Sequence, residues 1–594
     1  MKKLLATFAL VGLTVGLAAC SPSADDGIAN DGCTPIVVAT SSEKVNLMEE
    51  LGTKFKDSAE HKGLDSCATV VASNVASGKA AELLNQSTAE WRGTTPAPSV
   101  WSPASTTWTD NVASIAGEKV VAGAESFART PIVFGMPESM ATALGYPDRD
   151  ISIQEIHDLI ASPEGWGSQG KALWGSFKIA KTNPNTSTTG LSTILMQSYA
   201  ASGKQKDLTV DDVTAAEDFS RVFESGAIHY GDTTGKVLQN LADNASGSGS
   251  SYVSAIALEE TSLYNYNIGN PDSHTVQPGE TLTPPEEKLV AIYPSEGSMW
   301  SDNPAVVLNA SWVKPEEKAA AEAFVKFLHT KAAQETLPSY GFRTIDDSVD
   351  VSDKLNGTVG IDASKPAVTL PKPDPAVVSA AIDQWAQIRK PSAILQLIDI
   401  SGSMDDSIGN GKSKLTAAIE AAQGTLEDVR PTDEIGVWAF TTGLTSTIDG
   451  KNSNVAVEVR PFGELGDAKE SLKSDIGDLT HTNRQGTPLY DAVDTAYSYM
   501  KNHAETGRIN AIVVISDGAD TDSSSSVNSL IQRIKADQGE GANTDAVKIF
   551  AIGFGDGADM ESLEKLAKAS GGQVFDATDP ERLNEVFQSV MRNF

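Results

Sequence analysis

Oxygen-bearing side chains in the last third of the sequence have the types and spacing of a cation site. Asp399, Ser401 and Ser403 alternate directly after an almost wholly apolar run, 393–398. Gly402 eases the tight turn that would direct the three side-chain oxygens to one point. Hard oxygen donors with few carboxylates favour Mg²⁺, Mn²⁺ or Ca²⁺ over zinc. The pattern therefore predicts a divalent-cation site at the end of a buried strand.

Two later segments supply ligands of the same kind. Thr487 stands just before an amphipathic, helix-like stretch, and Asp517 follows the apolar run 512–515 and one serine. The carboxyl ends of the strands in an open α/β sheet form the edge where ligands bind. We therefore expect three loops to converge on one cation at this edge.

The elements that must position these side chains are alternating strands and helices. The run 393–398 is almost wholly apolar, as expected of a central parallel strand buried on both faces. Further strand-like runs occupy 433–440 and 549–555, with helical stretches between them. The sequence predicts an α/β domain with a mostly parallel central sheet over residues 391–594.

These residues, in this order and on these elements, resemble the metal-ion-dependent adhesion site of von Willebrand factor A (VWA) domains. The resemblance covers about residues 390–594. It implies a Rossmann-like fold and a metal held directly or through water by five side chains: Asp399, Ser401, Ser403, Thr487 and Asp517. It also implies Mg²⁺ as the expected cofactor, with Mn²⁺ or Ca²⁺ as alternatives, and one coordination position left for a carboxylate of a protein partner.

The neighbourhood of this site offers little for catalysis. A metal with an open position can activate water, so hydrolysis is an alternative. His481 is the one histidine near the metal loops, and we interpret it as a surface residue. Asp520 and Asp522 indicate either a second cation site or a solvated acidic loop. The stretch 409–413 resembles the end of a phosphate loop, but Asp406 replaces the first glycine and would repel phosphate. We expect a binding protein and not an enzyme.

The first twenty residues have the pattern of a lipoprotein signal peptide. Lys2 and Lys3 precede an apolar run, 4–17, and a short segment of small residues that ends at Cys20. The run is shorter than the roughly 20 residues that a membrane-spanning helix needs, which disfavours a transmembrane anchor. We predict lipidation of Cys20, a flexible tether at 21–32, and an extracytoplasmic location in which acyl chains are the only attachment to the bacterial cell membrane.

Cys33 and Cys67 are the remaining cysteines, and an oxidising compartment favours their pairing. Each precedes a strand-like run, 36–39 or 69–72, with a helical stretch between, which is the pattern of a βαβ unit. A disulfide would join the starts of two parallel strands. The alternative is a pair of free buried thiols.

Residues 33–364 alternate apolar runs and helical stretches, which predicts a second α/β domain. Prolines at 366, 371, 373 and 375 mark 365–390 as a linker with a short helix. The segments 36–42, 127–133, 181–190 and 341–343 make the domain similar to extracellular solute-binding proteins of the two-lobed kind. Hydroxyl-rich helix starts suit small polar or anionic solutes, although such residues also cap helices without binding anything. The ligand candidates are Thr40, Ser41, Ser42, Arg129, Thr188, Thr189 and Glu259.

Other possible solute-binding residues in this domain do not agree on the chemistry of the solute. Glu260, like Glu259, would favour a cationic or hydroxylated solute, so the charge of the solute stays open. Trp101, Trp108 and Trp174 line either a cleft or the core, and we favour the core.

Charge and length narrow the functions that are open to the chain. A formal net charge of -33 repels phosphate backbones and anionic lipids, which disfavours nucleic acid as a partner. The 594 residues are too many for one core. We expect a surface-anchored binding protein with a solute module and a metal-dependent protein-binding module. The alternatives are an adhesin with a degenerate N-terminal scaffold and the capture subunit of an importer.

Overall fold

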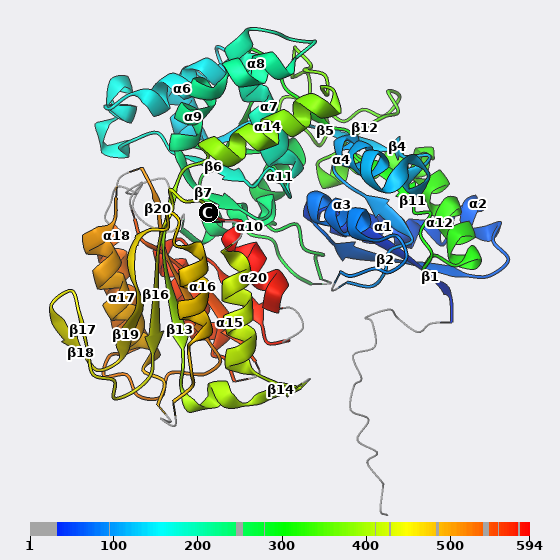
Figure 1. The fold of residues 1–594 in the computed structure, drawn as a ribbon. Coiled ribbons are helices and arrows are strands. Elements are labelled where there is room, and N and C mark those ends of the chain that lie inside the picture. The colour runs from blue at the N-terminus through cyan, green and yellow to red at the C-terminus, as the bar shows by residue number, and fades with distance from the viewer. Residues whose placement is uncertain are drawn as a thin grey trace, which may run out of the picture.

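The computed structural model describes eleven stretches of the chain: residues 32–93, 95–244, 253–277, 279–409, 411–426, 429–482, 486–505, 507–538, 546–555, 557–579 and 583–594. The predicted signal peptide, the lipidation site Cys20 and nearly all of the predicted tether lie outside these residues. Three α/β bodies are visible in Figure 1: two lobes from the first two thirds of the chain and one C-terminal domain.

The first lobe is built on a five-stranded sheet with the order β2-β1-β3-β11-β4. In its apolar core, Leu47 of helix α1 (Val45–Phe55) and Phe324 of helix α12 (Pro315–Leu328) pack with Ile36 of the sheet. Helix α3 (Ser77–Gln86) follows the edge strand. The strands are β1 (Thr34–Thr40), β2 (Ala68–Asn74), β3 (Val100–Ser102), β4 (Glu125–Ser126) and β11 (Pro304–Val307).

The second lobe is built on a seven-stranded sheet, in which β10-β5-β8-β6-β7 are neighbours and β9 and β12 also pair with β5. The helices α7 (Thr188–Ser202), α10 (Thr234–Asn244) and α11 (Glu260–Asn267) follow strands of this sheet. The strands are β5 (Ala128–Pro137), β6 (Ile179–Thr182), β7 (Ala227–Gly231), β8 (Ala255–Glu259), β9 (Leu289–Ile292), β10 (Trp300–Ser301) and β12 (Arg343–Thr344).

The chain passes from α12 (Pro315–Leu328) in the first lobe to β12 in the second lobe. Two further crossovers between the lobes are adjacent to each other. One lies between β4 and β5, and the other between β10 and β11. The backbone N–H of Phe127 donates to the carbonyl of Asn303 at 3.2 Å, so the two crossovers lie side by side. Such paired strands form a hinge about which two lobes can close on a ligand.

The C-terminal domain has a six-stranded sheet with the order β19-β16-β13-β20-β21-β22. Every neighbouring pair is parallel except β16 and β19, which are antiparallel. The strands are β13 (Ser392–Asp399), β16 (Glu434–Phe440), β19 (Ala456–Glu464), β20 (Ile509–Ser516), β21 (Lys548–Phe554) and β22 (Val574–Ala577). The mixed α/β class predicted for the chain is therefore confirmed.

Helices cover both faces of this sheet. Ile394 and Ile398 of β13 belong to the core shared with α15, whereas Leu395 and Leu397 belong to the core shared with α17. Alternate side chains of an extended strand point to opposite faces, and helices cover both faces, which is why β13 is almost wholly apolar between Ser392 and Asp399. The helices of one face are α15 (Lys414–Thr425), α16 (Lys469–Gly477) and α20 (Leu583–Met591), and those of the other are α17 (Leu489–His503), α18 (Val527–Gln538) and α19 (Met560–Ser570).

The predicted linker holds helix α14 (Pro375–Ile388), which is packed against the second lobe. It contacts α7, α8 (Val210–Ala215) and α9 (Glu217–Ser225). The indole N–H of Trp385 donates to Glu224 at 3.1 Å. This segment therefore does not separate the domains as a free spacer, because its helix is part of the second lobe.

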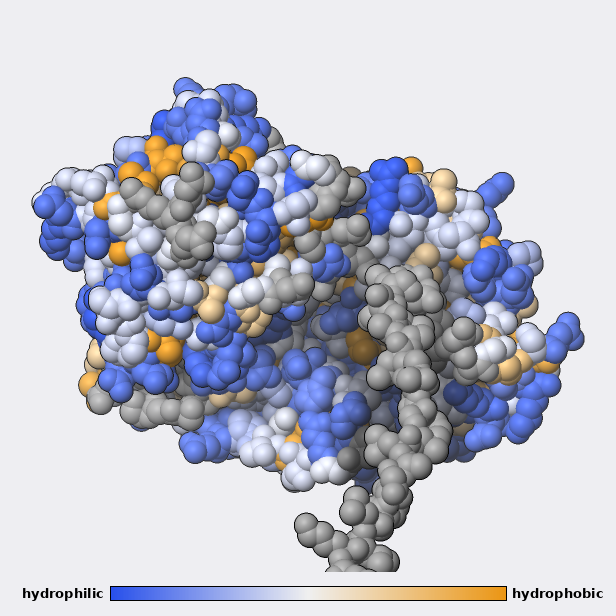
Figure 2. Space-filling view, turned by 90° about the horizontal axis from the view of Figure 1, so that it is seen from below, coloured by the Kyte–Doolittle hydropathy of each residue, from blue (hydrophilic) through white to orange (hydrophobic). Residues whose placement is uncertain are grey.

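Within the described residues, each helix is too short or too polar to cross a membrane. Figure 2 shows the molecule from below, relative to the view of Figure 1. The face seen there is mostly hydrophilic, with scattered hydrophobic residues.

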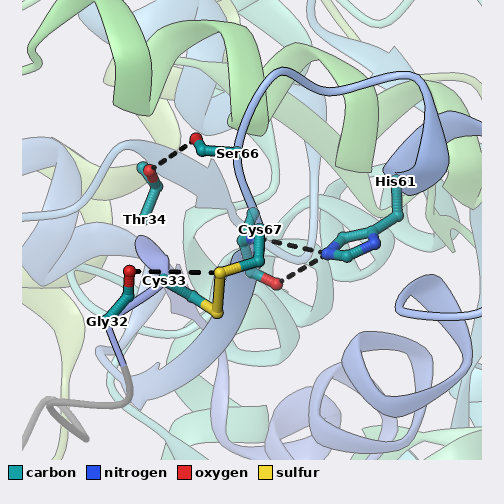
Figure 3. The surroundings of a disulfide bond; sticks show 7 residues. Gly32, Cys33, Thr34, His61, Ser66 and Cys67 are labelled. Atoms are coloured by element: carbon teal, nitrogen blue, oxygen red, sulfur yellow. Dashed lines mark hydrogen bonds between the residues drawn. A yellow bond between two sulfur atoms is a disulfide. The ribbon is translucent and has the colours of Figure 1, made fainter.

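A disulfide joins Cys33 and Cys67, with their Cα atoms 4.8 Å apart (Figure 3). β1 and β2 are parallel and in register from Thr34 opposite Ala68, so the bridge stands where both strands begin. The imidazole of His61 lies beside the backbone of Ala68, with Nε2 3.1 Å from the carbonyl oxygen. The bridge and the helix α1 between the strands form the βαβ arrangement that the sequence predicts.

Candidate metal centre and solute cleft

Asp399 ends the central strand β13 and is fully buried. Its carboxylate accepts the backbone N–H of Ser401 at 2.8 Å and the hydroxyl of Ser516 at 2.7 Å. Burial raises the pKa of Asp399 to about 6, although these two hydrogen bonds oppose the shift. Among the described residues, no basic side chain pairs with Asp399, so a bound cation would offset the cost of burying its charge.

The two serines of the first loop connect Asp399 with the second carboxylate. The hydroxyl oxygens of Ser401 and Ser403 are 3.1 Å apart, and Ser403 donates to Asp517 at 2.9 Å. Asp517 follows β20, which is the neighbour of β13 in the sheet. The structure thus brings together four of the five predicted metal ligands in one cluster at the carboxyl end of the sheet.

Thr487, the fifth predicted ligand, is buried just before helix α17. Its backbone N–H donates to the hydroxyl of Thr521 at 2.9 Å, which ties the two loops together. A Cβ atom at Gly518 would lie 3.8 Å from the Thr487 hydroxyl oxygen. The Thr487 hydroxyl therefore lies near the backbone of Gly518, the residue after Asp517, at the edge of the cluster.

Lys414 is a neighbour of the cluster that the sequence reasoning missed. Its ammonium donates to Asp517 at 2.7 Å and to Asp406 at 3.3 Å. Burial alone would lower the pKa of Lys414, but the hydrogen bonds and charges of Asp517 and Asp406 outweigh it and raise the pKa. Its position as the first residue of helix α15, close in sequence to the metal loop, was the available signal.

The donor set fits a hard divalent cation. Two carboxylates and three hydroxyls are gathered by loops that follow β13, precede α17 and follow β20. In the described part of the chain, no group of three or more His, Cys, Asp or Glu side chains could hold a metal, so any metal at this cluster depends on the hydroxyls. Such oxygen donors suit Mg²⁺, Mn²⁺ or Ca²⁺.

The other polar residues named near the site have partners of their own. Asp522 accepts the hydroxyl of Thr442, and Asp520 accepts the backbone N–H of Tyr490 at 3.2 Å. His481 lies 3.3 Å from Asp405, and Lys412 pairs with Glu420 at the surface. We find no contact in the described residues that joins these side chains to Asp399.

A second candidate site is a small cavity of about 20 Å³ between the two lobes. Ser41 and Ser42 from the first lobe and Thr188 and Glu259 from the second lobe line it, as the sequence analysis expected of ligand residues. The lining residues that the sequence analysis missed either adjoin predicted residues or come from other helix starts and loops: Glu43, Ala76, Ser77, Ala104, Thr186, Ser187, Asp232, Thr233 and Thr234.

Two buried carboxylates face this cavity from opposite lobes. Glu259 accepts the hydroxyls of Thr189 and Ser301, and Glu43 accepts the hydroxyl of Ser41. Burial, followed by the charge of Glu43, raises the pKa of Glu259 to about 7. Near neutral pH the Glu259 carboxyl therefore exists in both protonation states.

The lobes are in contact around the cavity. The backbone N–H of Gly78 in α3 donates to the carbonyl of Thr186 at 2.9 Å, and the indole of Trp108 donates to Thr188 at 2.7 Å. A Cβ atom at Gly78 would lie only 2.2 Å from the carbonyl oxygen of Asn185, so the close approach requires glycine. This is the closed arrangement of the cleft.

The remaining candidates lie away from the cavity. Arg129 is exposed on β5, where it pairs with Asp347 at 3.4 Å and lies over the ring of Trp300. Glu260 is buried and pairs with Arg343 at 2.6 Å. Thr40 is buried, with its hydroxyl 3.4 Å from the carbonyl of Ser102. These three side chains meet partners within the protein because the fold pairs segments far apart in sequence.

The tryptophans differ from one another in their surroundings. Trp101 and Trp108 are buried in the core, and Trp108 also reaches the cleft through Thr188. Trp174 packs edge-on against Trp166 with their ring centroids 5.0 Å apart.

Each of the two domains matches a known protein family. Residues 36–343 match the family described as bacterial extracellular solute-binding protein, and residues 394–589 match the von Willebrand factor type A domain. Uncharacterized proteins from two strains of Mycobacterium tuberculosis, CDC 1551 and H37Rv, are each 22% identical over 488 residues, 80% of this chain and 64% of theirs. The matched region thus spans less than two thirds of the length of these relatives.

Solved structures with a similar fold are distant. The sulfate-binding protein of Mycobacterium tuberculosis H37Rv is 15% identical, with a TM-score of 0.36, over 54% of this chain and 90% of its own. A von Willebrand factor type A protein of Catenulispora acidiphila is 22% identical, with a TM-score of 0.28, over 34% of this chain and 42% of its own. A mussel byssus thread matrix protein with a zinc-occupied metal site is 17% identical, with a TM-score of 0.27, over 34% and 47%.

The solute-binding family covers more than half of the chain, and its two lobes are present in the fold. The chain therefore belongs to the bacterial extracellular solute-binding proteins and carries, after the solute-binding domain, a von Willebrand factor type A domain.

Proposed function

We propose that this protein is an extracytoplasmic binding protein whose VWA domain holds a divalent cation and, through it, a carboxylate of a protein partner. The observation that carries the proposal is the hydrogen-bonded cluster of Asp399, Ser401, Ser403 and Asp517 at the carboxyl end of the sheet. Asp399, Ser401, Ser403, Thr487 and Asp517 would hold the ion, with Mg²⁺ as the expected metal. A cation bound there would supply a positive charge, and a carboxylate of the partner would complete its coordination.

The position of the cluster supports binding to another molecule. β13 begins beside the second lobe, where the backbone N–H of Lys390 donates to the Tyr230 hydroxyl at 2.9 Å, and ends at Asp399. At about 3.3 Å per residue, the eight-residue strand separates the cluster from this contact by roughly 25 Å. The loop that follows, with β14 (Ser407–Gly409), lies at the lower edge of Figure 1, away from both lobes.

The surface near this edge favours a polar mode of recognition. The face shown in Figure 2 is mostly hydrophilic, and no broad hydrophobic area stands out on it. A partner that meets such a face gains little from apolar burial, so charge-based contacts through a metal would carry more of the specificity. We propose binding and not catalysis, because His481 pairs with Asp405 outside the cluster.

The solute-binding domain is proposed to bind a small polar solute in the cleft between the lobes. The closed cavity of about 20 Å³ has room for about one water molecule, so the lobes must part to admit a solute. The cavity lining of hydroxyls and two buried carboxylates, Glu43 and Glu259, supports a ligand rich in hydrogen-bonding groups. In the adhesin alternative, this domain is a scaffold without a solute. In the importer alternative, it delivers its solute to a permease.

Anchoring through a lipidated Cys20 completes the proposal. Mass spectrometry of the chain isolated from its membrane tests it, because an acylated Cys20 at a new N-terminus is the expected product. A chain that retains residues 1–19 without acyl groups would contradict the anchor.

The metal-dependent function is tested by capture of a partner. The full chain, immobilised with Mg²⁺ or with a chelator, is exposed to an envelope extract. The proposal predicts a partner retained only with Mg²⁺ and lost with Asp399→Ala, while Asp520→Ala, outside the cluster, still retains it. A partner held equally with the chelator, or by Asp399→Ala, would contradict the metal-mediated contact.

A further inference from the structure

A larger chamber of about 610 Å³ lies in front of the small solute cavity. Both lobes line it, and so does the VWA domain through Phe575, Asp576, Ser589 and Arg592. The chamber and the cavity share four lining residues: Ser42, Ala76, Asp232 and Thr233. The cavity therefore adjoins a space that the VWA domain helps to enclose.

The end of helix α20 contacts both lobes across this chamber. The Arg592 guanidinium pairs with Glu82 of α3 in the first lobe at 3.3 Å. The Ser589 hydroxyl donates to Asp232 of the second lobe, a residue that lines the solute cavity, at 2.8 Å. In Figure 1 the C-terminus and α20 lie next to α10 between the lobes. One short segment of the VWA domain thus bridges the two sides of the cleft.

The contacts to the two lobes differ in strength. On the second lobe, the backbone N–H of Tyr230 donates to the carbonyl of Asn593 at 3.0 Å, and the ammonium of Lys390 donates to the carbonyl of Ala227 at 3.0 Å. These groups are buried. On the first lobe, the described residues of the VWA domain make one ion pair, Arg592 with Glu82, in which Glu82 is 40% exposed. The VWA domain is therefore fixed to the second lobe and only lightly held to the first.

We propose that the C-terminal segment 589–593 is a latch on the solute cleft. Arg592 and Ser589 act as positioning residues of the solute site, because they hold α3 of the first lobe, through Glu82, and Asp232 of the second lobe on opposite sides of the chamber. Opening about the crossovers at Phe127 and Asn303 carries α3 away from α20, so the Arg592–Glu82 pair breaks together with the contact of Gly78 and Thr186. Solute exchange then requires release of the VWA domain from the first lobe.

The strength of the Arg592–Glu82 pair suits a reversible latch. Partly exposed ion pairs contribute little stability, so thermal motion breaks them readily. A reversal of one charge replaces this attraction with repulsion and shifts the lobes toward the open arrangement. The latch gives the VWA domain a role in solute binding although its metal cluster lies at the far end of the sheet.

Thiol labelling of the cleft tests the latch without knowledge of the solute. The reporter is Ser187→Cys, at the start of α7 on the cavity wall, in the full chain with Cys20→Ser and the Cys33–Cys67 bridge intact. We expect N-ethylmaleimide to react about three- to tenfold faster when Arg592→Glu or Glu82→Arg is added. The double variant, with the charges exchanged, is expected to return toward the original rate.

The controls separate the latch from a general loosening of the fold. Lys565→Ala removes an exposed ion pair with Glu561 in the same domain and is expected to leave the rate unchanged. Far-ultraviolet circular dichroism and the melting temperature show whether each variant is folded, and Glu82→Arg tests the pair from the other domain. Unchanged labelling in both single variants, or no recovery in the double variant, would overturn the latch. The labelling reaction contains neither added metal nor solute. Such a failure would therefore leave the proposed metal and solute binding untested and unchanged.

Discussion

The ammonium of Lys414 lies 2.7 Å from one carboxylate oxygen of Asp517, while the hydroxyl of Ser403 lies 2.9 Å from the other. The candidate metal cluster therefore already contains one positive charge, supplied by the protein. This charge balances a buried carboxylate when no metal is bound. It also repels an incoming cation.

Replacement of Lys414 by methionine is expected to have opposite effects on stability and on metal affinity. Loss of the ammonium leaves Asp517 without its partner, so the metal-free protein should lose about 2 kcal/mol of unfolding free energy. Removal of a positive charge next to a divalent ion should tighten Mg²⁺ binding by about tenfold. Urea unfolding in the presence of chelator and calorimetric titration with Mg²⁺ measure the two effects.

Lys412→Met is the matched control for this variant. Lys412 lies two residues earlier and pairs with Glu420 at the surface, so neither quantity should change. Weaker Mg²⁺ binding by Lys414→Met would mean that Lys414 orients Asp517 for the metal and does not oppose the metal.

Gly78→Val is expected to hold the two lobes apart. The added side chain would meet the backbone of Asn185 and Thr186, which cannot yield as a flexible side chain can. Small-angle X-ray scattering of the full chain should show a larger radius of gyration than the wild type. Gly424→Val, in a helix where a Cβ atom meets nothing within 4 Å, is the control. An unchanged scattering curve for Gly78→Val would show that the closed arrangement does not depend on this contact.

Glu259 is expected to make stability depend on pH. Its folded-state pKa is raised from 4.5 to about 7, chiefly by burial, so the folded state binds the proton more tightly than the unfolded state. The unfavourable contribution of the ionised group is absent below about pH 4.5 and complete above about pH 7. Between pH 5 and pH 8, Glu259→Gln should gain up to about 3 kcal/mol relative to the wild type. Urea unfolding at both pH values measures this gain, and a constant difference would contradict the raised pKa.

The Cys33–Cys67 bridge is expected to stabilise the first lobe. It closes a segment with a sequence separation of 34 at the start of β1 and β2. Removal of such a bridge costs about 2–4 kcal/mol, largely by freeing the unfolded chain. The double variant Cys33→Ala/Cys67→Ala should unfold at a correspondingly lower urea concentration. Equal stability of the two proteins, or free thiols at both positions in the unreduced wild type, would argue against the bridge.

Local patterns explain which parts of the molecule were predictable from the sequence. Asp399, Ser401 and Ser403 directly follow an apolar strand, so their common placement at one sheet edge follows from short-range rules. The pairing of Cys33 with Cys67 follows from the βαβ pattern around them. Both predictions depend on residues that are close in sequence or on neighbouring parallel strands.

Contacts between residues far apart in sequence could not be predicted from the sequence, because they depend on long-range packing. Lys414 and Asp517 are 103 residues apart, and no local pattern joins them. Glu43 and Glu259 meet at the cavity only because the lobes close, and Arg129 is drawn to Asp347 by a strand pairing between β5 and β12. The packing of α20 against both lobes likewise depends on how whole domains fit together.

Calorimetric titration of the full chain with Mg²⁺ measures directly whether the VWA domain has a divalent-cation site. Wild type, Asp399→Ala and the control Asp520→Ala are compared under the same conditions. We expect one saturable binding event in the wild type and in Asp520→Ala, and its loss in Asp399→Ala. Absence of saturable binding in the wild type, or undiminished binding in Asp399→Ala, would rule out a cation site at Asp399.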